Sequence, residues 1–408
     1  MKILHTSDWH IGRTFHTHST LANLGIVLDA LVELVRERGV DVVVVAGDVF
    51  DSAMPSKESY ALLTGTLRRL KEAGAAVVMT SGNHDSATRL GFQSEWAALA
   101  GIHIVTRPEQ YLEPITITDE FGPVHFYGIP YLEPVLIRHL HPGVSLKTHE
   151  QVLNFAMTRI RDDLAGRGGR SVVLAHCFAA GVGPAAESSD VERDITAGGL
   201  DVVPLGVFDG CDYVALGHIH GRATLTERVR YSGAPLHYSF SEAGKPRGAW
   251  LVELDAAGLG TAEHSTAEYS AAEESAAEHP AVEWVDLPVP RRLTVLTGEL
   301  ATLLTDETLA HNEGDWVKVV LIDRVRPLDA MRSLQTRFAH CVALEHRPAI
   351  TLEADGSTYA ERIRAATSDA EIVAGFLSFV RNGVGPSDFE SALIAELQTE
   401  QGAQEANA

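Results

Sequence analysis

The fold is decided by a stretch near the start of the chain, Lys2-Ile3-Leu4-His5-Thr6-Ser7-Asp8-Trp9-His10. Residues 2–6 predict a strand, and two polar residues of metal-binding type follow it closely. Asp8 and His10 lie two positions apart, so both side chains point to one face of an extended segment. A strand followed by such polar residues recurs along the chain, and this recurrence is the main signal in the sequence.

Strands and helices alternate over the first half of the chain. Apolar residues recur at helical spacing over residues 21–38 and predict an amphipathic helix. The run Val42-Val43-Val44-Val45-Ala46 is typical of a strand buried on both faces. Buried strands joined by helices predict a layered α/β sandwich. Further strands are predicted at 76–80, 172–175 and 213–216, and a second helix at 59–73.

Four more motifs follow predicted strands. A single such motif is more often a set of turn residues than a site. Ligands of α/β folds usually bind just beyond the carboxyl ends of strands, so five motifs in this position predict one site. Glycines precede three of the motifs and allow a sharp turn and a close approach of the backbone. The four motifs are Gly47-Asp48-Val49-Phe50-Asp51, Gly82-Asn83-His84-Asp85, His176, and Gly217-His218-Ile219-His220.

The residue types in these motifs suit two metal ions. Carboxylates offset the charge of the cations, and imidazoles and amide oxygens fill the remaining coordination positions. Two cations that share a bridging carboxylate, roughly 3.5–4 Å apart, clamp a phosphate for in-line attack. Mixed oxygen and nitrogen ligands with open positions favour Mn²⁺ or Fe over a closed structural zinc site. The sequence therefore predicts a two-metal phosphoesterase.

Taken together, the five motifs resemble the calcineurin-like metallophosphoesterase superfamily. Residues 1–255 resemble more closely the nuclease subunits of the bacterial SbcCD type, through the segments around Asp8 and Asp48 and through 213–220 and 230–235. The resemblance implies a four-layer metallophosphoesterase β-sandwich flanked by helices, with a small α/β capping domain and C-terminal helices. It also implies two divalent metal ions, with manganese as the metal.

The resemblance further implies a role for each site residue. His84 would be catalytic rather than a metal ligand. It would stand beside the scissile phosphate and stabilise the transition state or protonate the leaving oxygen, which suits an imidazole near neutral pH. The metals would polarise the phosphate and supply the hydroxide nucleophile. One metal would be held by Asp8, His10 and His220, the other by Asn83, His176 and His218, and Asp48 would bridge the two.

Two further aspartates each allow two interpretations. Asp51 and Asp85 are either partners that orient the ligand histidines or ordinary aspartates of surface turns. Relatives from archaea and eukaryotes often have histidine where this chain has Asp51, so no second catalytic histidine is expected there. His5 and His125 are expected to be structural.

The resemblance and the composition together predict four regions. A loose repeat of Ala-Glu-x-Ser within residues 261–280 keeps no single helix or strand face, which is typical of a flexible acidic linker. The predicted regions are a metallophosphoesterase (nuclease) domain at 1–255, an acidic low-complexity linker at 256–283, a DNA-capping domain at 284–352, and a helical segment at 365–400 that binds an ATPase partner.

The net charge of −22 is unusual for a protein that binds nucleic acid, because phosphate contacts normally need Lys and Arg. Much of this charge is local. Residues 251–283 hold eight Asp and Glu and no Lys or Arg, and residues 351–408 hold ten acids against three arginines. Such acid-rich segments are usually solvated and need not touch a substrate. The charge neither excludes DNA as the substrate nor favours it.

Localisation is predicted from cysteines and hydropathy. The three cysteines are scattered and odd in number, which argues against a disulfide framework and for a reducing, cytoplasmic setting. No apolar run approaches the roughly 18 residues that would span a bilayer, and no signal for secretion is evident.

The metal motifs alone leave the substrate open. The first hypothesis, from the resemblance, is a DNA nuclease subunit that acts with an SMC-like coiled-coil ATPase, SbcC, in DNA repair, recombination and replication. It would cut double-stranded ends exonucleolytically and single strands and hairpins endonucleolytically, as a homodimer within a heterotetramer. The alternatives are a phosphatase or phosphodiesterase for a small molecule or phosphoprotein, and a metal-bound scaffold that only positions the ATPase.

Overall fold

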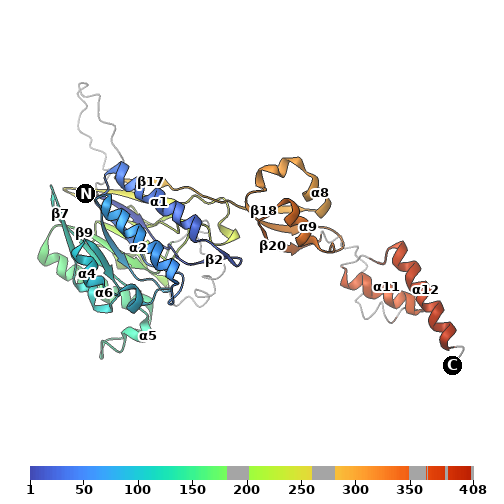
Figure 1. Cartoon of the computed structure of the whole chain (residues 1–408). Helices are drawn as coiled ribbons and strands as arrows, with labels where there is room; N and C mark the ends of the chain where they lie inside the picture. Colours follow the sequence, from blue (N-terminus) through green and yellow to red (C-terminus); the bar gives the residue numbers. More distant parts are fainter. Residues whose placement is uncertain (182–201, 260–280, 349–363, 365, 382–384, 406–408) are drawn as a thin grey trace, which may run out of the picture. The chain divides into compact units, whose positions relative to one another are not determined.

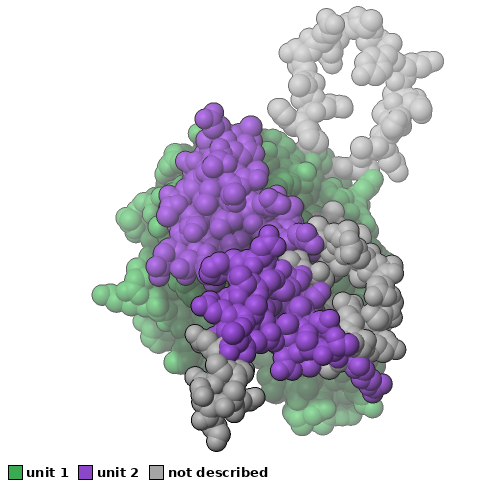
Figure 2. Space-filling model, turned by 90° about the vertical axis from the view of Figure 1, so that its right-hand side faces the viewer, with its two compact units in different colours: residues 1–292 green, residues 293–408 purple. Residues whose placement is uncertain are grey.

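The computed structural model describes residues 1–181, 202–259, 281–348, 364, 366–381 and 385–405 (Figure 1). The chain forms two compact units, residues 1–292 and 293–408, which Figure 2 shows in different colours. The predicted linker repeat at 261–280 lies outside the described residues. No helix among the described residues is long and apolar enough to cross a membrane.

The first sheet of unit 1 has a parallel centre. Strands β1, β4, β5 and β6 run parallel, and β15 joins β1 antiparallel. Strand β4 is buried along its whole length, as its β-branched run predicts. The order is β16 (Gly258–Leu259), β15 (Gly248–Asp255), β1 (Lys2–Thr6), β4 (Val42–Ala46), β5 (Ala76–Thr80) and β6 (Ile102–Val105).

The second sheet of unit 1 is also parallel at its centre. Strands β8, β9, β12 and β14 run parallel, while β7 and β13 pair antiparallel at the two edges. The order is β13 (Ala223–Thr224), β14 (Val229–Tyr231), β12 (Tyr213–Gly217), β9 (Arg170–His176), β8 (Gly122–Gly128) and β7 (Ile115–Asp119).

Three layers of apolar side chains hold these sheets together. One core lies between the two sheets and contains residues such as Val44 of β4 and Leu174 of β9. A second joins the first sheet to α1 (Leu21–Arg38) and α2 (Lys57–Glu72), which lie together on its outer face (Figure 1). A third joins the second sheet to α6 (His149–Arg167). The order helix, sheet, sheet, helix confirms the predicted four-layer α/β sandwich.

Local signals explain where the main helices begin and end. Helix α1 ends at Gly39, which has the left-handed conformation typical of a C-cap (φ 60°). Helix α2 begins after Ser56, whose side chain accepts a hydrogen bond from the N–H of Ser59. The part of this unit that the structure describes also has three shorter α-helices, α3 (Ala87–Leu90), α4 (Ser94–Leu99) and α5 (Pro134–Ile137).

One boundary differs from the prediction. Residues 282–286 form β17 (Val282–Asp286), which pairs antiparallel with β15 of the first sheet. Trp284, the predicted start of the second domain, lies opposite Trp250, with the two ring centroids 4.9 Å apart. Aromatic pairs of this kind stabilise a sheet across neighbouring strands. The first unit therefore extends to Arg292.

Unit 2 begins with a small parallel sheet. Strands β18 (Leu293–Gly298), β19 (Trp316–Leu321) and β20 (Cys341–His346) lie side by side in that order. Helices α8 (Leu300–Thr305) and α9 (Ala330–Arg337) contribute Leu303 and Leu334 to its core.

Two helices lie near the end of the chain, α11 (Asp369–Val380) and α12 (Asp388–Glu405). They agree with the C-terminal helices that the resemblance implies. Arg381 links them through a bidentate ion pair with Glu390, at 2.8 and 2.9 Å. None of their described residues is buried.

Candidate metal centre

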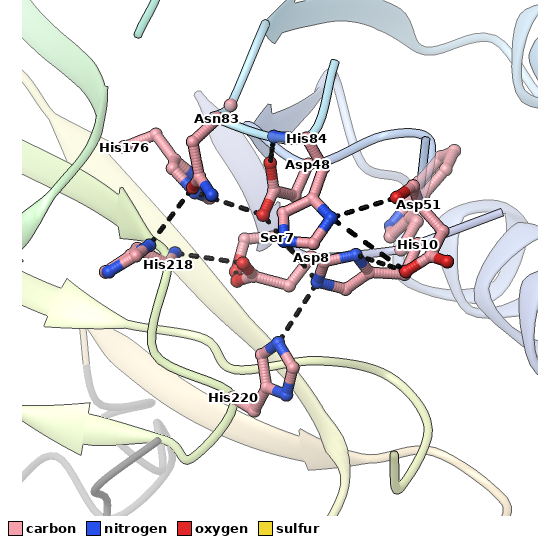
Figure 3. Close-up of polar contacts among 12 residues, drawn as sticks. Ser7, Asp8, His10, Asp48, Asp51, Asn83, His84, His176, His218 and His220 are labelled. Atoms are coloured by element: carbon pink, nitrogen blue, oxygen red, sulfur yellow. Dashed lines mark hydrogen bonds and ion pairs between the residues drawn. The ribbon is translucent and has the colours of Figure 1, made fainter. Parts of the chain in front are cut away.

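The predicted site residues lie at or just beyond the carboxyl ends of five strands from both sheets. Strands β1, β4 and β5 belong to the first sheet, and β9, which ends at His176, and β12 belong to the second. The structure brings all eight residues of the predicted site together (Figure 3). Six of them are buried: Asp8, His10, Asp48, His176, His218 and His220.

One half of the cluster contains Asp8, His10 and His220. Their potential ligand atoms all lie within 4.8 Å of one another. The Nε2 atoms of His10 and His220 are 3.0 Å apart. Two nitrogens that each lie about 2.1 Å from a cation, at about 90°, are separated by about this distance. The three side chains thus fit the cation set that the resemblance implies.

The other half centres on the amide of Asn83. Its Oδ1 lies 3.0 Å from Nε2 of His176 and 3.2 Å from Nδ1 of His218. Figure 3 shows these three residues together on one side of the cluster. An amide oxygen and two imidazole nitrogens are suitable ligands for a divalent transition metal.

Asp48 lies between the two halves. Its Oδ1 accepts a hydrogen bond of 2.9 Å from the backbone N–H of His84. Its Oδ2 lies 3.3 Å from Nε2 of His176 and 3.7 Å from Nε2 of His10. One carboxylate oxygen thus faces a histidine of each half, which is the arrangement that a bridging ligand requires.

The donor set itself indicates a cation. Nδ1 of His176 donates to the carbonyl of Ala46 at 2.9 Å, because a carbonyl can only accept. In the neutral ring Nε2 then has only a lone pair, yet it faces the acceptor oxygens of Asn83 and Asp48. Atoms that all accept can approach one another in a buried site only around a cation or a shared proton. The residues present therefore fit a pair of divalent metal ions.

Burial and charge together set the pKa values of the cluster. Burial lowers the pKa of His10 to about 4, so this ring is a neutral ligand at pH 7. Burial also raises the pKa of Asp8 to about 6. For His176 burial acts to lower the pKa, but the carboxylate of Asp48 overcomes it and raises the pKa to about 9. A proton on His176 thus offsets the negative charge when no metal does.

The backbone of the site is strained. Four predicted ligands have positive φ angles, which non-glycine residues rarely adopt. Such conformations cost about 1–3 kcal/mol each and persist where the surrounding structure enforces them, often at functional sites. A side chain at Gly217 would collide with the carbonyl of Ala46, so the close approach expected of this glycine is confirmed. The four are Asp8 (52°), His10 (44°), Asp48 (48°) and His218 (101°).

His84 differs from the buried ligands in exposure and in its contacts. Its side chain is 28% exposed, against 0–1% for His10, His176 and Asp48. Its Nδ1 donates to the carbonyl of Asp51 at 2.9 Å, which leaves Nε2 free in the neutral ring. Because its ring can be reached from solvent beside the cluster, a substrate could contact it.

The two tentative aspartates behave differently. Oδ1 of Asp51 lies 3.4 Å from Nδ1 of His10, and it accepts from Arg13 at 3.2 Å. Asp85 contacts the backbone rather than a ligand histidine. Its carboxylate accepts hydrogen bonds of 2.8–3.0 Å from the backbone N–H groups of Gly82, Val49 and Phe50. It thereby ties the Asp48 loop to the Asn83 loop.

Sequence reasoning missed a set of residues behind His220. Glu242 is buried and accepts from Nδ1 of His220 at 3.1 Å. Burial acts to raise its pKa, but the hydrogen bond from His220 and the nearby charges lower it to about 2. Tyr238 and Arg247 also pack here. Their only signal in the sequence is their position, shortly after the 230–235 segment that carries part of the resemblance.

A comparison with known protein families agrees with the motifs. The family described as calcineurin-like phosphoesterase matches residues 1–222. Among solved structures, TT1561 of Thermus thermophilus is 16% identical, with 62% of this chain and 93% of that chain covered and a TM-score of 0.36. A dimetal phosphatase from Danio rerio is 17% identical, with 57% and 86% covered and a TM-score of 0.34. GAP50, the anchor in the inner membrane complex of Plasmodium, is 10% identical, with 86% and 98% covered and a TM-score of 0.34.

Proposed function

This chain belongs to the calcineurin-like phosphoesterase family, and we propose that it is a manganese-dependent DNA nuclease subunit that resembles SbcD. It removes nucleotides from double-stranded ends and cuts single strands and hairpins. It acts in the cytoplasm with an SbcC-like coiled-coil ATPase, in DNA repair, recombination and replication.

The observation that carries the catalytic part is the shared carboxylate. Asp48 faces His176 of one half and His10 of the other, and both halves contain further oxygen and nitrogen ligands. When bound, two divalent cations polarise a phosphodiester and lower the pKa of water. The chain's own residues set where these cations bind and which face of them is open.

His84 is the residue proposed to act on the substrate. Its Nδ1 is held by the carbonyl of Asp51, which fixes the ring and leaves Nε2 for the phosphate or the leaving oxygen. General acid catalysis needs a proton donor within hydrogen-bonding reach of the leaving oxygen. A proton on Nε2, with Nδ1 still donating to the carbonyl of Asp51, makes the ring of His84 such a donor.

The case for DNA rests on unit 2 and on the resemblance. The loop between β19 and α9 exposes Arg324 and Arg326, and α9 adds the exposed Arg332. Surface arginines contact phosphates along a nucleic-acid backbone. Asp323 and Asp329 lie in the same segment, and the three arginines supply the cations that the capping role proposed for residues 284–352 needs.

The case for the ATPase rests on α11 and α12. Phe376 and Phe389 are exposed on these helices, and no described residue of either helix is buried. An amphipathic helix pair with an uncovered apolar face is typical of helix-mediated docking. Deleting residues 369–408 is expected to abolish binding to the ATPase in a pull-down of purified proteins. Unchanged binding would show that the partner docks elsewhere.

A second copy of the chain is proposed to pack on α4. Trp96 and Leu99 are exposed on this helix, with Phe92 just before it, and clusters of this kind mark interaction surfaces. Trp96→Glu should convert a dimer into a monomer in sedimentation-velocity runs. A wild-type chain that is monomeric at all concentrations would rule out the homodimer.

The deciding experiment compares two substrates in Mn²⁺. One is an end-labelled linear duplex closed by a hairpin, and the other is bis-para-nitrophenyl phosphate. Each is incubated with and without the ATPase and ATP, with EDTA and His84→Ala as controls. The nuclease proposal predicts that the duplex is degraded or its hairpin opened, and that EDTA and His84→Ala abolish this. Hydrolysis of the small diester alone, even with the ATPase, would indicate a small-molecule phosphoesterase.

A further inference from the structure

The segment after β14, residues 232–247, contacts only one half of the metal cluster among the described contacts. The hydroxyl of Ser232 lies 2.8 Å from that of Ser7, which in turn donates to Asp8. The hydroxyl of Tyr238 donates to the carbonyl of Trp9 at 2.5 Å, between the two ligands of the first motif. The segment therefore contacts the loop that contains Asp8 and His10.

Glu242 is the polar centre of this segment. One oxygen accepts from Nδ1 of His220 at 3.1 Å. The other accepts from the N–H of Tyr238 at 2.9 Å and from the guanidinium of Arg247 at 2.5 Å. Glu242 and Arg247 are both buried, and Arg247 also donates to the backbone carbonyl of His220. The pair thus holds His220 by its ring and by its backbone.

This arrangement decides which ring nitrogen of His220 carries the proton. A carboxylate accepts and does not donate here, so the proton lies on Nδ1. Nε2 then presents its lone pair, and this atom faces Nε2 of His10 across 3.0 Å. Metal-bound histidines generally donate their other N–H group in this way, which fixes both the tautomer and the orientation of the ring.

We propose that Glu242 is a positioning residue that holds His220 ready for a metal ion, with Arg247 fixing the carboxylate. The proposal rests on the metal site of the proposed function and does not depend on DNA as the substrate. Its chemistry is that of a divalent cation bound by Asp8, His10 and His220.

His176 of the other half has a neutral partner instead, because its Nδ1 donates to the backbone carbonyl of Ala46. A charged acceptor makes a stronger hydrogen bond than a neutral one. Among the described contacts, Glu242 touches His220 and no other predicted ligand, so we expect it to act on the ion bound by Asp8, His10 and His220 only.

The alternative is that Glu242 and Arg247 form an ion pair that only stabilises the fold. Asp119 and Arg170 provide the matched control, because they form a largely buried pair in the same unit. Their described contacts involve no residue of the cluster: Arg170 donates to Asp119 and to the carbonyls of Leu254, Asp255 and Gly122.

The test measures Mn²⁺ binding to the full chain by calorimetry, with metal content measured after dialysis. Glu242→Ala should weaken one of two binding events about 10–100-fold and leave the other unchanged. Glu242→Gln retains an acceptor oxygen and should recover part of the loss. Glu242→Ala leaves the charge of Arg247 without its partner. The double variant Glu242→Gln/Arg247→Gln removes both charges and is therefore measured as well. It should weaken the same Mn²⁺-binding event as Glu242→Ala. Asp119→Asn should lower the unfolding temperature and leave both affinities unchanged.

The outcomes separate the two proposals. Wild-type affinities for both ions in the Glu242 variants would overturn the positioning role. An equal loss of affinity in Asp119→Asn would overturn it too, because general destabilisation would then explain the effect. A wild-type chain that binds no Mn²⁺ would overturn the metal site of the proposed function itself.

Discussion

The metal cluster of unit 1 and the helix pair of unit 2 differ in which kinds of side chain they bury and which they expose. The cluster buries charged residues, such as Asp48 and Glu242, and each of these two has hydrogen-bonding or ionic partners within the chain. Helices α11 and α12 instead expose large apolar side chains, such as Phe376 and Phe389. Burying charge is costly unless it is partnered, and exposing apolar surface forgoes the main source of stability.

The difference separates two kinds of function. The cluster is specified by contacts within one unit, so its chemistry should be intrinsic to the chain. None of the described residues of the helix pair is buried, so its function should depend on what covers it. Substitutions in the two regions test whether the cluster acts through contacts within the chain and the helix pair through a partner. The largest effects on activity are expected in the cluster.

The largest effect is expected at the shared carboxylate. Asp48→Asn keeps a residue that tolerates the left-handed backbone but removes the charge that both cations need. Mn²⁺ binding should fall for both ions, and hydrolysis should drop on the order of 10⁴-fold. Metal analysis and single-turnover cleavage measure the two effects. Retention of one full-affinity ion would show that Asp48 does not bridge the halves.

A smaller effect is expected at His84, which is proposed to act on the substrate and not to hold metal. His84→Ala should lower the cleavage rate about 10²–10⁴-fold, the usual contribution of general acid–base catalysis. Because the ring is partly exposed and lies beside the cluster, the Mn²⁺ content should remain unchanged. Potential ligand atoms of His84, His10 and Asp48 lie within 4.8 Å of one another, so loss of an ion in this variant would contradict the role and make His84 a ligand.

Much of the fold and of the cluster was predictable because each depends on local patterns. The β-branched run at 42–46 could only be a buried strand, and Asp48 had to follow its carboxyl end. A positive φ at Asp48 was not predictable, because aspartate carries no obligatory signal for it. The roles of Asp51 and Asp85 were not predictable either, because both are turn aspartates in the sequence and differ only in tertiary contacts.

Two features depend on long-range pairing and were missed for that reason. Strand β17 joins the first sheet after the linker, so its partner β15 is separated from it by the low-complexity repeat. Glu242 follows no strand motif and contacts His220 from a short turn of 3₁₀ helix. Periodicity and motif spacing carry no information on such contacts.

A third prediction compares an ion pair from each region. The Arg170–Asp119 pair is 5% and 15% exposed, and the Arg381–Glu390 pair is 25% and 33% exposed. Asp119→Asn leaves a buried guanidinium without its counter-charge and should cost about 3 kcal/mol. Glu390→Gln breaks a more exposed pair, which water screens, and should cost much less. Urea unfolding measures both, and equal costs would remove the distinction between the regions.

The Asp119 effect should depend on pH in a defined direction. Hydrogen bonds from Arg170 hold the pKa of Asp119 well below its ordinary value, although burial opposes them. A group whose pKa is lowered by folding contributes its full stability above the unfolded value, about 3.9, and loses it as the pH falls towards the folded value. The stability gap between wild type and Asp119→Asn should therefore be constant from about pH 5 to 7 and narrow below about pH 4. A gap that widens in acid would contradict the pairing.

The smallest change in stability is expected for substitutions on the exposed surface of α12. These substitutions test whether the helix pair acts through a partner. Leu397 of α12 is 55% exposed, and Leu140, between α5 and α6, is 57% exposed. Because both are surface positions, Leu397→Glu and Leu140→Glu should each change the free energy of unfolding by no more than about 0.5 kcal/mol. Only Leu397→Glu should weaken binding to the ATPase, by about tenfold or more, since it puts a charge into the apolar face that the partner covers. Surface plasmon resonance with the purified ATPase measures this difference. Equal binding by the two variants would mean that the face of α12 is not covered by that partner, whereas a large loss of stability in Leu397→Glu alone would mean that the helix pair is covered by its own chain.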